Sequence, residues 1–188
     1  LSTTLPFTDV KNTDWCFSEV ARVYADGIMG GTSNTTFSPA GILTRGQVVA
    51  MLYRMAGSPA VTANTTGFSD VDNGAYYADA VKWASGKEIV GGYADGTFAP
   101  NRAITREQLA AILYRYAKAN GADISVGEDT NLLSYKDFQS VGQYAVPALQ
   151  WAVGSGLIGG TTNATLSPTG TATRAQAAVI LVRFFGMT

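Results

Sequence analysis

The residues of this chain that could do chemistry are three arginines that recur in the same setting. Arg45, Arg106 and Arg174 each follow a threonine, in the segments LTRGQ, ITREQ and ATRAQ. A guanidinium at the first position of a helix lies beside backbone N–H groups and the positive end of the helix dipole, a combination that favours a carboxylate or another anion. We therefore expect these arginines to bind an anionic ligand. We also expect their replacement by alanine to weaken that binding while the chain stays folded.

Other kinds of chemistry are limited by what the composition lacks. The sequence has no His and one Cys, Cys16, which excludes His-based acid–base catalysis and the usual His and Cys metal sites. We therefore expect no metal and no cofactor. With 13 basic and 14 acidic side chains, the net charge of −1 provides no basic field for a nucleic acid or an anionic membrane. No apolar run approaches the length of about 18 residues that a membrane span needs, so we expect no membrane insertion.

Three copies of one unit account for most of the chain. The first two, which begin with FTDV and FSDV, align without a gap, and the third, which begins with YKDF, needs one extra residue. The chain has 188 residues, of which 46% are hydrophobic, so it can form one substantial core, and we predict a single domain over residues 1–188. The predicted motifs are residues 7–57, 68–119 and 135–186, and their matching residues include Asp9, Asp70 and Asp137.

Each motif is predicted to contain two helices joined by a structured loop. Apolar residues at helical spacing indicate first helices at about 15–25, 76–86 and 144–154. A threonine followed three residues later by a glutamine is typical of a capping box, and one opens each second helix. The second helices are apolar on more than one face, which favours an all-α bundle with pseudo-threefold symmetry and leaves open which helices lie at its axis. The capping residues are Thr44, Thr105, Thr173, Gln47, Gln108 and Gln176.

The diglycine after each first helix has two interpretations. Glycine at this place can end a helix with a residue at positive φ. It can also let a ligand approach the backbone closely. The glycines concerned are Gly30, Gly91 and Gly159, each followed by a second glycine.

The three copies resemble tandem S-layer homology motifs. The resemblance rests on FTDV, FSP and LTR in the first motif and on FSDV, FAP and ITR in the second, in the same order and spacing, and it covers residues 7–185. The third motif is weaker, with YKDF, a leucine in place of the loop phenylalanine, and ATR. The resemblance implies a three-pronged helical fold and a non-catalytic, extracellular anchor at the cell wall or S-layer. It also implies that grooves between motifs bind secondary cell-wall polysaccharide through a pyruvylated amino sugar or, in some bacteria, peptidoglycan.

A sugar ligand would also need an aromatic partner for its apolar face. Trp15, Tyr76 and Tyr144 share one equivalent position and are the first candidates for ligand contact. Trp83 and Trp151 lie in the middle of predicted helices and fit the core better. A second set of arginines lies nine residues after the first set, among apolar neighbours, and is interpreted as structural: Arg54, Arg115 and Arg183.

Two other functions stay open. The three-motif surface could be a protein-interaction or self-assembly module that binds other S-layer subunits, which an apolar patch outside the grooves would favour. A carboxylate-based hydrolase needs two acids about 5 to 9.5 Å apart, but the acids that recur here come one per motif. For the arginines at the helix starts, the alternative to ligand binding is a salt bridge to the aspartate of a neighbouring motif.

Overall fold

The structure of this chain is formed by helices connected by long loops. The computed structural model describes residues 4–186, so the ends of the predicted domain at residues 1–3 and 187–188 lie outside the described residues. Within residues 4–186, extended backbone segments pair only in isolated bridges, which confirms the predicted all-α class. No helix among these residues is long and apolar enough to cross a membrane. The helices are α1 (Phe17–Ala25), α2 (Arg45–Met55), α3 (Ala78–Gly86), α4 (Arg106–Ala119), α5 (Val146–Gly154) and α6 (Arg174–Phe185), with short 3-10 helices η1 (Leu132–Ser134), η2 (Phe138–Ser140) and η3 (Gln143–Ala145).

The second helices of the motifs, α2, α4 and α6, begin at reciprocal side-chain caps. The hydroxyl oxygen of Thr44 accepts a hydrogen bond from the backbone N–H of Gln47 (3.3 Å), and the side chain of Gln47 accepts one from the backbone N–H of Thr44 (3.0 Å). Each cap thereby satisfies two backbone N–H groups that no carbonyl of the helix can reach. The same pair is present at the other two helix starts: Thr105 with Gln108, and Thr173 with Gln176.

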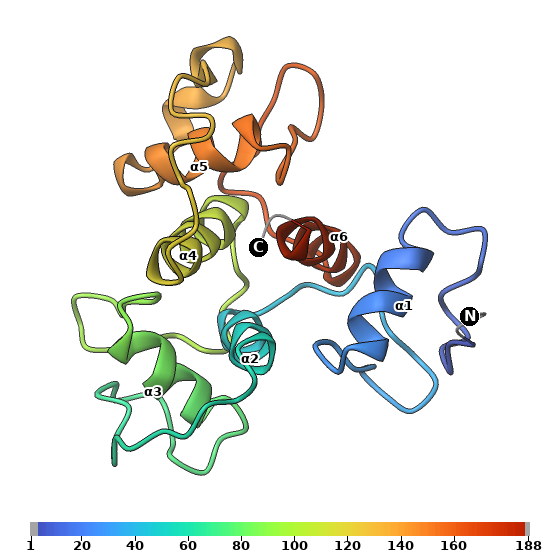
Figure 1. Cartoon of the computed structure of the whole chain (residues 1–188), viewed down its shortest axis with the longest axis vertical. Helices are drawn as coiled ribbons and strands as arrows, with labels where there is room; N and C mark the ends of the chain where they lie inside the picture. The colour runs from blue at the N-terminus through green and yellow to red at the C-terminus, as the bar shows by residue number, and fades with distance from the viewer. Residues whose placement is uncertain (1–3, 187–188) are drawn as a thin grey trace.

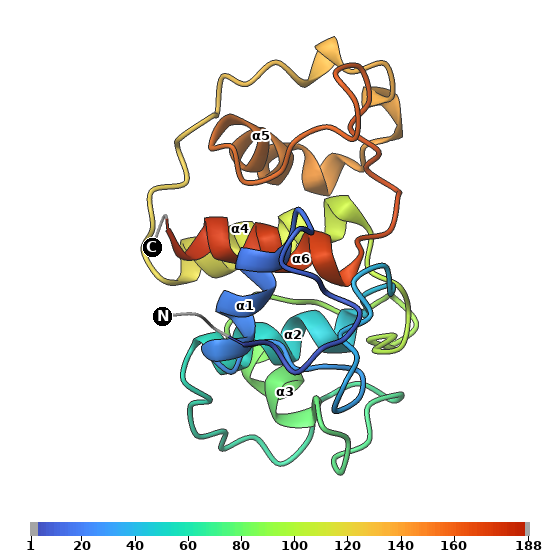
Figure 2. The same ribbon diagram turned by 90° about the vertical axis from the view of Figure 1, so that its right-hand side faces the viewer.

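Each second helix packs closely against the first helix of the next motif. α2 packs against α3, α4 against α5, and α6 against α1. Figure 1 shows three lobes around a central group formed by α2, α4 and α6, so the second helices are the ones that lie in the middle. Figure 2 shows these three helices running side by side. Because α1 packs against α6, the first helix of the first motif is covered by the second helix of the last motif.

A closed ring of backbone hydrogen bonds links the three motifs just before the second helices. Leu43 N–H donates to Ala172 O (3.0 Å), Ala172 N–H donates to Ile104 O (3.2 Å), and Ile104 N–H donates to Leu43 O (2.9 Å). All three residues are buried. Since every bond in the ring needs a partner from another motif, the ring closes only when all three motifs are in place.

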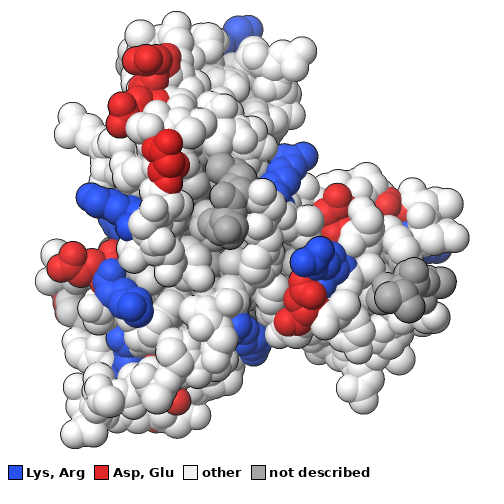
Figure 3. Space-filling model, viewed as in Figure 1, with Lys and Arg blue, Asp and Glu red and all other residues white. Residues whose placement is uncertain are grey.

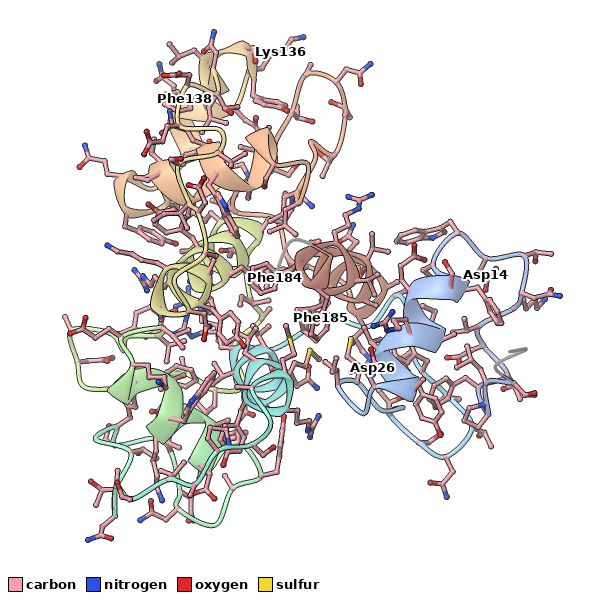
Figure 4. The ribbon with its side chains drawn as sticks, in the orientation of Figure 1. Asp14, Asp26, Lys136, Phe138, Phe184 and Phe185 are labelled. Atoms are coloured by element: carbon pink, nitrogen blue, oxygen red, sulfur yellow. The ribbon has the colours of Figure 1, made fainter. Side chains whose placement is uncertain are left out.

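Large aromatic side chains fill the space beside the central helices. Figure 4 shows Phe184 and Phe185 projecting from the end of α6 into the middle of the molecule. The ring centroid of Phe184 lies 5.7 Å from that of Tyr116 on α4 and 6.2 Å from that of Trp151 on α5. Trp83 and Trp151 are both buried, which agrees with their expected place in the core.

Replacing Thr105 by alanine should lower the free energy of unfolding by about 1 kcal/mol, because the backbone N–H of Gln108 loses its side-chain acceptor at the start of α4. Urea unfolding followed by circular dichroism measures this change. Thr62→Ala is the control, since Thr62 is exposed in the connection between two motifs and its replacement should leave the midpoint unchanged. Equal stability of the wild type and the Thr105→Ala variant would contradict the capping role.

Candidate functional site

The backbone N–H groups at the starts of α2, α4 and α6 are bonded to the loop of another motif. In α2, Arg45 N–H donates to Arg102 O (3.0 Å) and Gly46 N–H donates to Pro100 O (2.8 Å). These N–H groups are therefore not free for an anion, because they already donate to carbonyl oxygens of the protein. The equivalent acceptors are Gly170 and Pro168 for α4, and Gly41 and Pro39 for α6.

The side chain of the arginine at each helix start extends into the motif whose loop accepts from the backbone N–H groups. We call these residues the first arginines: Arg45, Arg106 and Arg174. They are only 6–8% exposed. In Arg174, Nε–H donates to Phe37 O (2.8 Å) and Nη2–H donates to Gly30 O (2.6 Å). Each guanidinium is thus a tie between two motifs, and two of its five N–H groups are used for that tie. Arg45 bonds in the same way to Phe98 O and Gly91 O, and Arg106 to Leu166 O and Gly159 O.

An aspartate holds the same loop from within its own motif. The carboxylate of Asp9 accepts hydrogen bonds from the backbone N–H groups of Phe37 and Ser38 (both 2.8 Å). Burial by itself would raise the pKa of Asp9, but these two donors, with the charge of Arg174 nearby, lower it below its usual value. Within the described residues no salt bridge joins Asp9 to Arg174, so the expected alternative of a direct ion pair is not observed. Asp70 and Asp137 make the equivalent bonds.

The two glycines of each diglycine have different roles. Gly30 supplies the carbonyl that a first arginine binds, and a Cβ at this position would meet open space. At Gly31 a Cβ would lie 2.3 Å from Ser33 O, so only glycine fits there. Neither glycine has a positive φ, and the interpretation as a helix end is therefore wrong for this pair. The positive φ follows α1 at Gly27, and its equivalents are Glu88 and Gly156.

Three grooves lie between the motifs, and each is built from all three of them. Groove 1, of about 350 Å³, is lined by the diglycine turn and α2 of the first motif, by one aromatic residue of the second motif and by one arginine of the third. Grooves 2 and 3, of about 250 and 440 Å³, follow the same rule around the second and third motifs. The aromatic residue and first arginine are Tyr76 and Arg174 in groove 1, Tyr144 and Arg45 in groove 2, and Trp15 and Arg106 in groove 3.

One aromatic residue of each groove lies in the chain just before a first helix. Those helices begin two residues later than expected, which leaves the rings outside the regular helix. Large rings that stay exposed beside a groove are available to stack on a ligand. Trp15, Tyr76 and Tyr144 are 68%, 66% and 52% exposed, respectively.

Each groove is also lined by one arginine from the later part of a second helix. We call these residues the second arginines: Arg54, Arg115 and Arg183. Nη1–H of Arg54 donates to Ile28 O (3.1 Å), which fits the expected structural role. The place of these side chains in the grooves is not predicted by the sequence analysis above. The signal was available, because each second arginine follows the capping glutamine by seven residues, or about two helical turns, and therefore shares its face of the helix.

Each groove combines two guanidinium groups, a glutamine side chain and an aromatic ring, and no carboxylate is among the described residues that line it. On the face shown in Figure 3, basic side chains lie at the recesses between the lobes. The grooves are therefore locally basic in a chain whose net charge is −1. Guanidinium groups beside an exposed ring suit a ring-shaped polar ligand that carries a carboxylate.

Comparison with known proteins identifies a family and several relatives. Residues 6–49, 67–110 and 134–178 match the family described as S-layer homology domain. An endoglucanase of Bacillus sp. (strain KSM-635) is 36% identical over 96% of this chain and 19% of its own length. A cellulosome-anchoring protein of Acetivibrio thermocellus is 25% identical over 95% of the chain and 40% of its own length. A surface-layer 125 kDa protein of Lysinibacillus sphaericus is 27% identical over 84% of the chain and 13% of its own length, so the chain spans less than half of each of these relatives.

Replacing Arg174 by alanine should lower the free energy of unfolding by about 3 kcal/mol, because two carbonyls, those of Phe37 and Gly30, lose a charged donor. This outcome differs from the expectation that alanine variants of the first arginines affect binding alone. Urea unfolding gives the measurement. Arg22→Ala is the control, because Arg22 forms an exposed ion pair with Asp26 that should contribute less than about 1 kcal/mol. A loss no larger than that of the control would show that the tie contributes little.

Proposed function

Because the chain belongs to the S-layer homology domain family, we propose that its three grooves bind a glycan of the bacterial cell wall. The family is one of non-catalytic anchoring modules at the cell surface, and two relatives are named for a surface layer and for cellulosome anchoring. Relatives that are named as enzymes share only a small part of their length with this chain. The proposal extends the anchoring role to a specific kind of ligand, the secondary cell-wall polysaccharide, bound through a pyruvylated or otherwise anionic amino sugar.

The observation that supports this ligand is the meeting of two arginines and an exposed aromatic ring in every groove. In groove 1, Arg54 lies on the helix of the first motif, Arg174 comes from the third motif and Tyr76 comes from the second. A carboxylate on the sugar can accept charge-assisted hydrogen bonds from the guanidinium groups, while the apolar face of the sugar packs on the ring. The same combination is present in grooves 2 and 3.

Single contacts of this kind are too weak to anchor a protein by themselves. A hydrogen bond to a charged group contributes about 1.5 to 3 kcal/mol, whereas association costs about 4 to 15 kcal/mol. Three grooves on one module can bind three sites of a repeating polymer, and such avidity can increase the apparent affinity by about 10² to 10⁴. We therefore propose that the three motifs act as one unit over the whole chain.

The second arginines provide the test, because they line the grooves without tying the motifs together. The triple variant in which Arg54, Arg115 and Arg183 are replaced by glutamine should lose at least about tenfold in affinity for purified cell-wall sacculi. It should stay folded and lose less stability than Arg174→Ala, because the bond from Arg54 to Ile28 O lies within one motif. The control replaces three exposed lysines outside the grooves by glutamine and changes the net charge equally. These control positions are Lys11, Lys87 and Lys136.

Sacculi stripped with hydrofluoric acid distinguish the ligands. Loss of binding after stripping is expected, because the acid releases polymers joined through phosphodiesters. Binding retained on stripped sacculi would identify peptidoglycan as the ligand instead. Absence of binding to either preparation would overturn the glycan proposal and favour a module that assembles with other S-layer subunits.

A further inference from the structure

The three grooves differ in how firmly their ligand-facing groups are held, and groove 2 has the smallest volume of the three. Its volume is about 250 Å³, compared with about 350 Å³ for groove 1 and about 440 Å³ for groove 3. Groove 2 also contains two tyrosines, Tyr144 and Tyr93. At the position of Tyr93 the other two motifs have threonines.

Tyr144 is tethered to the start of α4 by an acidic residue that occurs in one motif alone. The hydroxyl of Tyr144 donates to Oε1 of Glu107 (3.0 Å), and the backbone N–H of Gly142 donates to Oε2 (2.9 Å). Burial and this carboxylate raise the pKa of the Tyr144 hydroxyl well above its ordinary value, so the hydroxyl remains a donor. Glu107 is 9% exposed and does not line the groove. The residues at its position in the other motifs are Gly46 and Ala175.

The other groups of groove 2 are held by stacking. The guanidinium of Arg45 lies 5.1 Å from the ring centroid of Tyr93 and 4.7 Å from that of Phe98. On Tyr93 a second guanidinium, that of Arg102, lies 5.5 Å from the ring centroid. Gln108 Nε2 donates to the Tyr93 hydroxyl (3.4 Å). Tyr144, Tyr93 and Arg45 of groove 2 are therefore each held by contacts within the protein.

The other grooves lack part or all of this support. In groove 1, Arg174 stacks on Phe37 (4.7 Å). Tyr76 has an edge contact with Tyr77 (4.9 Å between centroids) and a side-chain hydrogen bond with Thr44, but no carboxylate in the described part of the chain holds its hydroxyl. In groove 3, a leucine at position 166 offers no ring to Arg106. Within the described residues, the side chain of Trp15 has no hydrogen bond or ring contact and is 68% exposed.

We propose that the three grooves form a graded set in which groove 2 binds the wall glycan most tightly and groove 3 least, and that Glu107 is the positioning residue that makes groove 2 the tightest. The physical reason is that a side chain already held in place loses less conformational entropy on binding. This inference rests on the proposed function, because it ranks the same grooves.

The test measures the dissociation constant for the polysaccharide that hydrofluoric acid releases from cell walls of the bacterium that produces the chain. Glu107→Ala should raise the constant of the tightest class of sites about two- to tenfold, the equivalent of immobilising one side chain. Alanine is the residue present at the equivalent position 175. Tyr144→Phe, which keeps the ring and removes the hydroxyl, should have a similar effect. Tyr24→Phe, at an exposed tyrosine outside the three grooves, is its control and should leave that class unchanged.

A double variant separates positioning from a general loss of stability. In the Tyr144→Ala background the exchange Glu107→Ala should change binding no further, because the ring that Glu107 holds is gone. A further loss in that background would overturn the positioning role. The grading would be overturned if Trp15→Ala or Tyr76→Ala weakened the tightest class of sites more than Tyr144→Ala does. These outcomes are distinct from failure of the proposed function, in which the wild-type chain binds neither sacculi nor the released polymer.

Discussion

The start of each second helix is completed by the loop of another motif, and the rest of the structure depends on this exchange. A buried N–H group without a partner costs about 1 to 3 kcal/mol, and each helix start brings several such groups. The capping threonine accepts from one of these N–H groups. Carbonyl oxygens of the neighbouring motif accept from two others, as at Arg45 and Gly46. In each motif these acceptors come from another motif, so the three motifs complete one another as a closed set. The ring of bonds through Leu43, Ile104 and Ala172 has the same requirement.

The same exchange builds the grooves. When Arg174 crosses to bind the carbonyls of Phe37 and Gly30, its guanidinium becomes part of the wall between two motifs. An exposed aromatic residue of the remaining motif forms the other side. The first arginines therefore serve the fold and the site together, whereas second arginines such as Arg54 line the site from a single helix. Under the proposed function, binding and stability are therefore coupled at the first arginines and separable at the second arginines.

Local features were predictable from sequence, and partners across motifs were not. The capping boxes follow from a threonine and a glutamine three residues apart, a spacing at which both side chains reach the backbone of the same turn. The burial of Trp83 and Trp151 follows from their place within apolar helices. The hydrogen bonds between the helix starts and carbonyl oxygens of another motif have no local sequence signature. The hydrogen bond between Glu107 and Tyr144, which joins residues 37 positions apart, has no such signature either.

By itself, the sequence determined the three motifs, the helical class, the starts of the second helices and the absence of histidine chemistry, because each depends on residue type or on neighbours within a few positions. The tertiary structure alone decided which motifs meet and which side chains share a groove. The ties made by the first arginines span 46 to 144 positions. At such separations contact is set by how the whole chain closes on itself, as where α1, near one end of the chain, packs against α6, near the other. The composition of each groove is therefore a property of the closed assembly of motifs, and no single motif contains it.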